Sequence, residues 1–258
     1  MRSVPRSAAP TRNGPVMSVA LPAHLDVPTF ARFGVRAFIT TRAAGDFNLN
    51  PEVEGARERW HGVQRALAAV GAPRLASAKQ VHGTRVLVHH APWDGWLRID
   101  DADGHLVLGP GAAAVTIADC VPVFIAHPAG AVAAVHAGWR GTAGGILPEA
   151  LRLFAANGFP VDECVVHLGP SICGRCYEVG VDVYEQLTGW ETRRPRNVDL
   201  RALLADQAKR LGVSQWSASG ECTKCDNDAL FSHRAGDAGR QIGVIYSTAV
   251  LGAPLISP

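Results

Sequence analysis

The stretch AAAVTIADCVPVFIAHPAGAVAAVH, residues 112–136, decides the fold of this chain. Three apolar runs make up most of it, at residues 112–118, 121–126 and 131–135. Short apolar runs that end at turn residues are typical of strands that are buried on both faces. The polar side chains Asp119, Cys120 and His136 stand where these runs end. We therefore expect three consecutive buried strands with chemically active groups at their ends.

The segments around this stretch show the patterns of both strands and helices. Further strands are predicted at residues 33–41, 85–89, 165–168 and 241–250. Helical periodicity, closed in each case by a glycine, predicts helices at residues 52–70, 144–157 and 199–211. Because strands and helices do not alternate strictly, the predicted fold class is α/β of the mixed α+β kind. We expect one compact domain over residues 21–258, with mixed β-sheets and flanking helices, preceded by a disordered tail of residues 1–20.

The composition is that of a globular protein, and it argues against several classes of function. Hydrophobic residues make up 47% and charged residues 19% of the 258 residues, and the net charge is +2. Because there is no run rich in Lys and Arg, nucleic acid is not an expected partner. A membrane is not expected either, since no apolar stretch reaches the length of about 18 residues that a membrane helix needs. Six cysteines without a secretory signal indicate reduced thiols and a cytoplasmic protein.

Three residues, His82, Cys120 and His136, combine into a candidate metal site. Each stands near a strand end, where side chains from different strands can converge. Two imidazoles and one thiolate suit tetrahedral Zn²⁺, and three protein ligands leave the fourth position to water or substrate, as in catalytic sites. The alternative is structural: a buried cysteine that only packs, and histidines whose rings bind backbone carbonyls.

Two charged residues stand close to these ligands in the sequence. Arg140, in the segment HAGWRGT, could bind an anion or form a structural ion pair. Asp119 adjoins Cys120 and could orient a ligand histidine, donate or accept a proton, or cap a turn. The residues alone leave these alternatives open.

At these positions the chain resembles a known family. The segments that carry the resemblance follow in order and span about residues 33–247: TTRAAGDFNLN, KQVHGTRV, DADGHLV, TIADCVPVFIA, AVHAGWRGTAGGI, LGPSICGRCYEVG, GECTKC and LFSHRAGDAGRQIGVI. The set resembles the laccase-domain, or multicopper polyphenol oxidase-like, family, whose members are also known as purine nucleoside phosphorylases or peptidoglycan editing factors. The resemblance implies an α/β fold with one Zn²⁺ per chain, bound by His82, Cys120 and His136. It also implies phosphorolysis of adenosine, inosine and 5′-methylthioadenosine, with a purine nucleoside and phosphate as partners, and deamination of adenosine.

Further roles follow for the residues around the metal. Phosphate is expected at Arg42, whose guanidinium matches phosphate oxygens bidentately, with Arg140 as the second choice. Asp119 or a zinc-bound water is expected to manage the proton, so Asp119, Arg42 and Arg140 are the predicted catalytic residues. Arg42, Asn48 and Gln80 are the predicted substrate-binding residues. The motif TTRAAGDFNLN, which holds Arg42 and Asn48, is shorter here than in relatives.

Two rival chemistries require residues that this chain lacks. Multicopper oxidases need many histidines, typically in His-x-His pairs, and blue-copper centres often add an axial Met. The chain has no His-x-His, and its two methionines, Met1 and Met17, lie in the expected tail, so copper is not expected. Conventional zinc nucleoside deaminases carry His-x-Glu and Pro-Cys-x-x-Cys. Neither pattern occurs, so any deamination would rest on a different set of residues.

Four other cysteines form two C-x-x-C pairs, Cys173/Cys176 and Cys222/Cys225. Such pairs indicate a structural zinc site when about 15–20 residues separate them, but here residues 177–221 lie between them. No metal role is therefore assigned to them from the sequence. Two alternatives for the function stay open. One is a peptidoglycan editing or polyphenol oxidase activity, and the other is a non-catalytic, metal-stabilised binding module.

Overall fold

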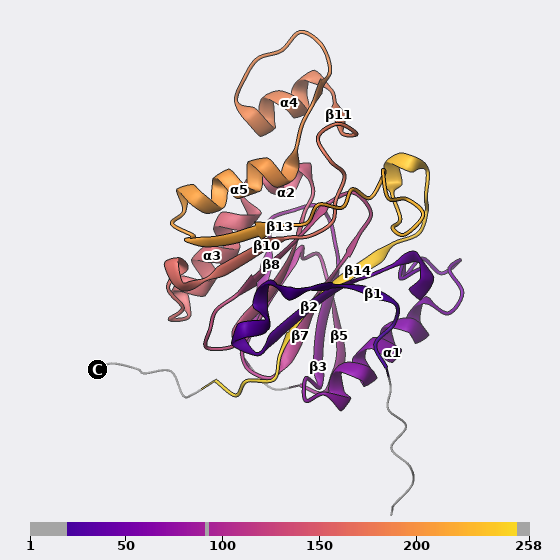
Figure 1. The fold of residues 1–258 in the computed structure, drawn as a ribbon, viewed down its shortest axis with the longest axis vertical. Helices are drawn as coiled ribbons and strands as arrows, with labels where there is room; N and C mark the ends of the chain where they lie inside the picture. Colours follow the sequence, from indigo (N-terminus) through magenta and orange to yellow (C-terminus); the bar gives the residue numbers. More distant parts are fainter. Residues whose placement is uncertain (1–19, 91–92, 252–258) are drawn as a thin grey trace, which may run out of the picture.

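Two six-stranded β-sheets form the centre of the protein in the computed structural model, which describes residues 20–90 and 93–251 (Figure 1). In order across the first sheet, the strands are β1 (His24–Val27), β2 (Val35–Thr40), β14 (Gln241–Ser247), β7 (Gly111–Ile117), β3 (Arg74–Lys79) and β5 (Gly95–Asp100). Across the second sheet they are β13 (Gln215–Ala218), β10 (Val165–Leu168), β8 (Val121–Ala126), β9 (Val132–Ala137), β6 (Gly104–Val107) and β4 (Val86–His89). A small third sheet pairs β11 (Glu178–Val179) with β12 (Arg196–Asn197). The expected tail, residues 1–20, lies outside the described residues except for Ala20.

Both large sheets mix parallel and antiparallel pairs. In the first sheet β3 runs parallel to both β5 and β7, whereas β14 is antiparallel to β7 and β2. In the second sheet β9 is antiparallel to β8 and β6, and β6 is parallel to β4. The predicted fold class, α/β of the mixed α+β kind with mixed sheets, is confirmed.

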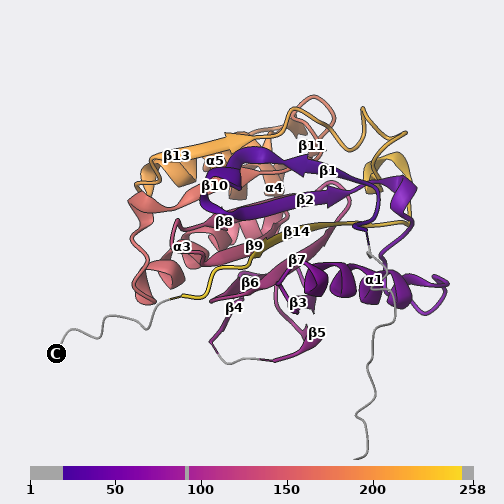
Figure 2. The same cartoon turned by 60° about the horizontal axis from the view of Figure 1, so that its bottom comes forward.

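Helices cover the outer faces of the two sheets (Figures 1 and 2). Helix α1 (Ala56–Ala69) packs on β3 and β5 of the first sheet, and α3 (Ile146–Ala156) and α5 (Leu200–Arg210) pack on the second. The short α2 (Trp139–Gly144) contacts both of these and also α4 (Val181–Thr188), which stands beyond the sheets. Four short 3-10 helices complete the described part: η1 (Pro28–Phe33), η2 (Arg42–Ala44), η3 (Val161–Glu163) and η4 (His233–Ala235). Among the described helices, none combines the length and the apolar character that crossing a membrane requires.

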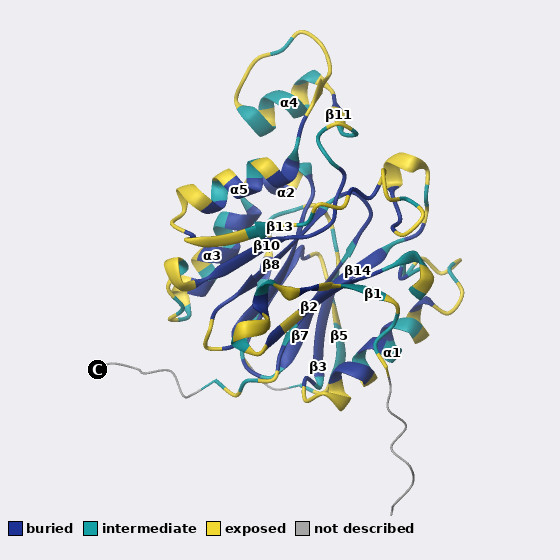
Figure 3. Cartoon of the chain, in the orientation of Figure 1, coloured by how far each residue is buried: buried dark blue, intermediate teal, exposed yellow. Residues whose placement is uncertain are grey.

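The alternation of side chains along the central strands explains the long apolar stretch. On β7, Ala113 and Val115 face the second sheet, while Ala112 and Ala114 face α1. Strand β8 is divided in the same way, with Phe124 between the sheets and its neighbours under α3 and α5. Because both faces of these strands are covered, polar side chains do not alternate with apolar ones, and all residues of β7 and β8 except Thr116 are buried (Figure 3).

Glycines account for the main differences between predicted and observed helices. The helix expected at residues 144–157 is α3, which begins at Ile146 because Gly145, with a φ of 87°, separates it from α2, a helix that the sequence did not predict. The helix expected from residue 52 begins at Ala56, after Gly55 with a φ of 71°. The last strand ends at Ser247 rather than at residue 250. The other predicted strands and helices are found, with shifts of a few residues at their ends.

Candidate metal centre and its cavity

The three predicted metal ligands meet at one end of the two sheets. His82 lies in the loop between β3 and β4, Cys120 in the turn between β7 and β8, and His136 near the end of β9. Pairing of β8 with β9 sets Pro122 opposite His136, which brings the turn with Cys120 beside the imidazole. The ligand atoms of all three residues lie within 4.8 Å of one another. The rings of His82 and His136 meet edge to face, with centroids 4.8 Å apart.

A buried carboxylate, Asp103, fixes two of these ligands. The Nδ1 of His136 lies 2.8 Å from Asp103 Oδ1, and because an ionised carboxylate only accepts, Nδ1 carries the proton and Nε2 is left for a metal. The same carboxylate accepts backbone N–H groups from Val81 (3.2 Å), His82 (2.9 Å) and Gly83 (2.7 Å). Burial alone raises the pKa of Asp103, but the hydrogen bonds from His136 and Gly83 hold it below its usual value. One residue therefore orients both the ring of His136 and the loop of His82.

The charges of the site suit a metal ligand set. Burial raises the pKa of Cys120, but the charge of His136 and the hydrogen bonds from the rings of His136 and His82 together outweigh this effect and lower it to about 6. Burial likewise lowers the pKa of His136, and the Cys120 thiolate and Asp103 raise it to about 9. A thiolate is the form of cysteine that binds metal. A Cβ on Gly138 would lie 3.0 Å from both Cys120 Sγ and His82 Cδ2, so the chain passes the ligands at a distance where a larger residue would press on them. Two imidazoles and a thiolate held this closely fit Zn²⁺.

The candidate metal ligands stand in the wall of a cavity of about 620 Å³. This volume is within the range of small-molecule sites. Five Lys or Arg side chains line it: Lys79, Arg98, Arg140, Arg234 and Arg240. Among the described residues, Asp119 is the one carboxylate in the lining. The cavity therefore favours an anionic ligand.

Two aromatic side chains of the lining carry arginines on their faces. Arg140 lies over the ring of Trp139 at 4.3 Å, and Arg234 lies over Tyr177 at 5.0 Å. Burial, and next the charge of Cys120, raise the pKa of Tyr177 to about 12. Its hydroxyl therefore stays protonated at neutral pH and can donate a hydrogen bond.

Asp119 is held by the loops around it. Its Oδ1 accepts the hydroxyls of Thr223 (2.6 Å) and Ser232 (2.7 Å), and its Oδ2 accepts the backbone N–H of Arg234 (2.7 Å). Its φ of 88° places it in the left-handed region, which Asp tolerates better than most residues. Asp119 thus faces the cavity and anchors η4, whereas the carboxylate that orients a ligand histidine is Asp103.

Of the other predicted site residues, the structure brings Arg140, Asn48 and Gln80 to the cavity but not Arg42. Gln80 accepts the N–H and hydroxyl of Thr116 (both 2.7 Å) and donates to the Thr116 carbonyl (2.8 Å), tying the end of β3 to β7. The amide of Asn48 donates to the Ala238 carbonyl (3.2 Å).

Arg42 binds the loop of residues 227–237 instead. Its Nη2 lies 2.7 Å from Asp237, its Nε donates to the carbonyl of Asn227 (3.0 Å), and its guanidinium lies 4.3 Å over the ring of Phe231. The sequence did not predict Asp103, Arg234 or Arg240 as site residues, although DADGHLV and LFSHRAGDAGRQIGVI contain them.

Fold and site together define a two-sheet protein with a candidate three-ligand metal centre in the wall of a cationic cavity. The chain belongs to the multi-copper polyphenol oxidoreductase laccase family, whose model matches residues 36–248. A purine nucleoside phosphorylase of Mycobacterium tuberculosis is 38% identical over 220 residues, covering 78% of this chain and 86% of that protein. One of Streptomyces coelicolor is 36% identical over 198 residues, covering 70% and 80%. The crystal structure of Neisseria meningitidis NMB0706 is similar with a TM-score of 0.71 and 32% identity, covering 87% of this chain and 98% of that one. The predicted family is confirmed.

Proposed function

We propose that this chain is a zinc-dependent purine nucleoside phosphorylase that cleaves adenosine, inosine and 5′-methylthioadenosine with phosphate. One observation carries the proposal: the candidate metal ligands share a cavity with five Lys or Arg side chains and, among the described residues, one carboxylate. Such a site suits phosphate, because guanidinium and ammonium groups bind its oxygens. The names of the Mycobacterium and Streptomyces relatives support the same activity.

Phosphate is assigned to Arg140 in this proposal. In phosphorolysis a phosphate oxygen forms a bond to ribose C1′ while the bond from C1′ to the purine nitrogen breaks and the purine takes the electron pair. Arg140 is exposed, lines the cavity, and is braced by its stacking on Trp139. Arg42, the first choice from the sequence, is assigned a positioning role, since it holds Asp237 and so the loop that presents Arg234 to the cavity.

The purine is assigned to the aromatic side of the cavity. Trp139 and Tyr177 line the cavity, and the ring face opposite each stacked arginine could take a base. The neutral hydroxyl of Tyr177 can donate a hydrogen bond to the purine as negative charge develops on it. Asn48 and Gln80 complete the proposed substrate-binding set.

Zinc at His82, Cys120 and His136 would supply a Lewis acid and a water of lowered pKa. The residues behind it keep the ligands in place: Asp103 accepts a hydrogen bond from Nδ1 of His136, so the ring presents Nε2 to the metal. Asp119 is assigned to hold η4 rather than to transfer a proton, because both of its oxygens already accept hydrogen bonds.

Product analysis with adenosine tests the proposal. Purified protein is incubated with adenosine in the presence and in the absence of phosphate, next to the variants His82→Ala and Cys164→Ala. The second variant is the control, because Cys164 is not one of the three candidate metal ligands. We expect the wild type and the control to form adenine and ribose 1-phosphate, and to do so only when phosphate is present. His82→Ala should form neither product.

Other products would point to other functions. Inosine formed without phosphate would show deamination of adenosine at the same site. No turnover by a folded, zinc-loaded protein would contradict the proposal and favour a binding module or an activity on peptidoglycan precursors. His82→Ala protein that folds without turnover would mark the metal ligands as catalytic, since losing a structural ligand also unfolds the protein.

A further inference from the structure

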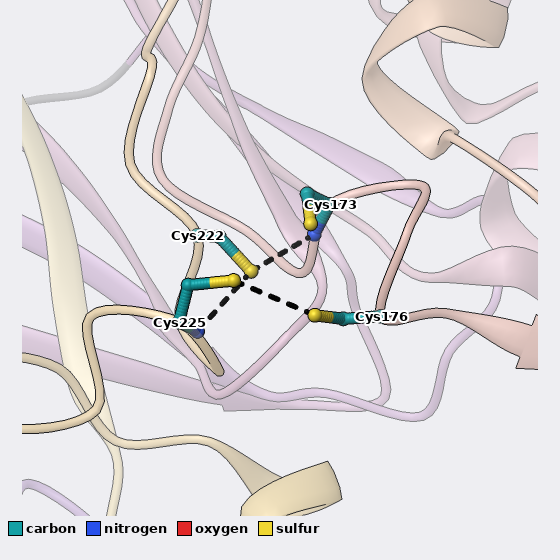
Figure 4. Close-up of side chains that lie close together, drawn as sticks. All are labelled: Cys173, Cys176, Cys222 and Cys225. Carbon is teal, nitrogen blue, oxygen red and sulfur yellow. Dashed lines mark hydrogen bonds between the residues drawn. The ribbon is translucent and has the colours of Figure 1, made fainter.

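The two C-x-x-C pairs meet in space and form a group separate from the three ligands of the cavity wall. Cys173 and Cys176 lie in the loop between β10 and β11, and Cys222 and Cys225 lie in the loop after β13. Figure 4 shows the four side chains pointing toward one another from these two loops. Their sulfur atoms all lie within 4.8 Å of one another. The fold therefore brings the two pairs together although they are far apart in the sequence.

Backbone contacts hold the two loops together at the cysteines. Ser171 and Cys222 form an isolated parallel β-bridge, and the N–H of Thr223 donates to the carbonyl of Ser171 (3.2 Å). The Cys222 N–H itself donates to the carboxylate of Asp226 (2.8 Å). The positions of the thiols are thus set by main-chain pairing and not only by contacts between side chains.

Two backbone N–H groups point at one of the sulfurs. The N–H of Cys173 lies 3.2 Å and that of Cys225 lies 3.4 Å from the Sγ of Cys222, which is 4% exposed (Figure 4). Backbone N–H groups in these positions would hold the sulfur in place as a metal ligand. Thiolate is the form that binds a metal.

The distances also suit four ligands of one ion. With a Zn–S bond of about 2.3 Å, ligand sulfurs of a tetrahedral site are separated by about 3.8 Å. The sulfurs of Cys176 and Cys225 are 3.5 Å apart, and every pair of the four is within 4.8 Å, so small side-chain movements suffice. One disulfide would use only two of the four sulfurs. Each C-x-x-C also contains one basic residue, Arg175 or Lys224, to offset the double negative charge of a zinc ion with four thiolates.

We propose that Cys173, Cys176, Cys222 and Cys225 bind a second Zn²⁺ in a closed, structural site. Four thiolates in tetrahedral arrangement select zinc and leave no position for substrate. The chain then carries two zinc ions instead of the one that the sequence predicts.

This site ties two walls of the cavity together. Cys176 precedes Tyr177, which lines the cavity, and Cys222 precedes Thr223, whose hydroxyl binds Asp119. The zinc ion therefore holds the loops from which the aromatic wall and the anchor of η4 extend.

Zinc content of the full chain, purified under reducing conditions, tests the proposal. Elemental analysis is expected to find two zinc ions per chain in the wild type and one in each of two variants, Cys173→Ser/Cys176→Ser and His82→Ala/His136→Ala. The control Cys164→Ala should keep two. One zinc in the wild type, or an intact mass showing a disulfide between two of the four cysteines of the reduced preparation, would overturn the proposal.

X-ray absorption at the zinc edge tests the ligands even if one variant fails to fold. An all-sulfur shell is expected in His82→Ala/His136→Ala, and a shell of nitrogen or oxygen with sulfur in Cys173→Ser/Cys176→Ser. For the wild type, the number of sulfur ligands averaged over its two zinc ions must be greater than one. A wild-type shell of one sulfur per zinc would contradict a site of four thiolates.

Discussion

Replacing Asp103 by Asn removes the charge that holds two ligands of the candidate metal centre. The carboxylate accepts four hydrogen bonds, two at each oxygen, from the ring of His136 and from three backbone N–H groups of residues 81–83. An amide has one oxygen, so its NH₂ group must face two donors whichever way it turns. Asp103→Asn therefore loses two charge-assisted hydrogen bonds. It also places its NH₂ group against two other donors at a position that is completely buried.

The size of the effect follows from these contacts. Hydrogen bonds to charged groups contribute roughly 1.5–3 kcal/mol each, so we expect a loss of about 3–5 kcal/mol in the free energy of unfolding. Partners that orient metal ligands typically contribute about 10–100-fold to metal affinity, and zinc should bind more weakly by about that factor.

The assays are denaturant unfolding and competition for zinc with a chelator. Asp101→Asn is the matched control, because it makes the same change at an exposed residue of the same loop, where a φ of 59° also suits Asn. The control should leave both quantities within about 0.5 kcal/mol of wild type. An Asp103→Asn protein with the zinc affinity and stability of the control would refute the reasoning.

Three further perturbations test other parts of the site. Gly138→Ala puts a methyl group 3.0 Å from the thiol of Cys120, so the variant should bind zinc more weakly than the wild type. Competition with a chelator measures both affinities. Arg140→Ala should raise the KM for phosphate about tenfold or more with a smaller change in the KM for adenosine, and equal changes in both would remove Arg140 from the phosphate site. Burial lowers the pKa of His89 to about 4 and that of His105 to about 3, so the folded protein binds fewer protons than the unfolded chain below the ordinary histidine pKa of about 6.5. The two histidines leave the free energy of unfolding unchanged above that pH, and they reduce it as the pH falls toward 4. At pH 5 the free energy of unfolding should be lower than at pH 7 by on the order of 2 kcal/mol per histidine. A His89→Gln protein should show a smaller pH dependence of stability.

The central strands could be predicted because burial on both faces leaves a continuous apolar pattern. The runs that became β7, β8 and β9 show it, with Thr116 as the one partly exposed residue among them. Strands β3 (RLASAK) and β5 (GWLRID) contain Lys, Arg and Asp, and no run of β-branched residues indicates them. They become strands because they pair with each other and, through β3, with β7. Such pairing is a tertiary effect that local propensity does not contain.

The candidate metal ligands could be expected from their place at strand ends and from the resemblance, but Asp103 behind them could not. Asp103 reaches His136 because β6 pairs with β9, which sets Gly104 opposite Val135. Asp103 and His136 lie far apart in the sequence, and the sequence of one strand alone does not determine its register with another. The cavity arginines Arg234 and Arg240 were missed for a similar reason, since they form no charged run and gather only when the loop after β13 folds over the site.

Tracing isotopically labelled inorganic phosphate through one turnover is the most direct test of the proposed chemistry. The account predicts that label enters the sugar product at C1 in a one-to-one ratio with the adenine set free. Adenine accompanied by unlabelled free ribose would show that water, not phosphate, attacks the sugar, and would contradict it.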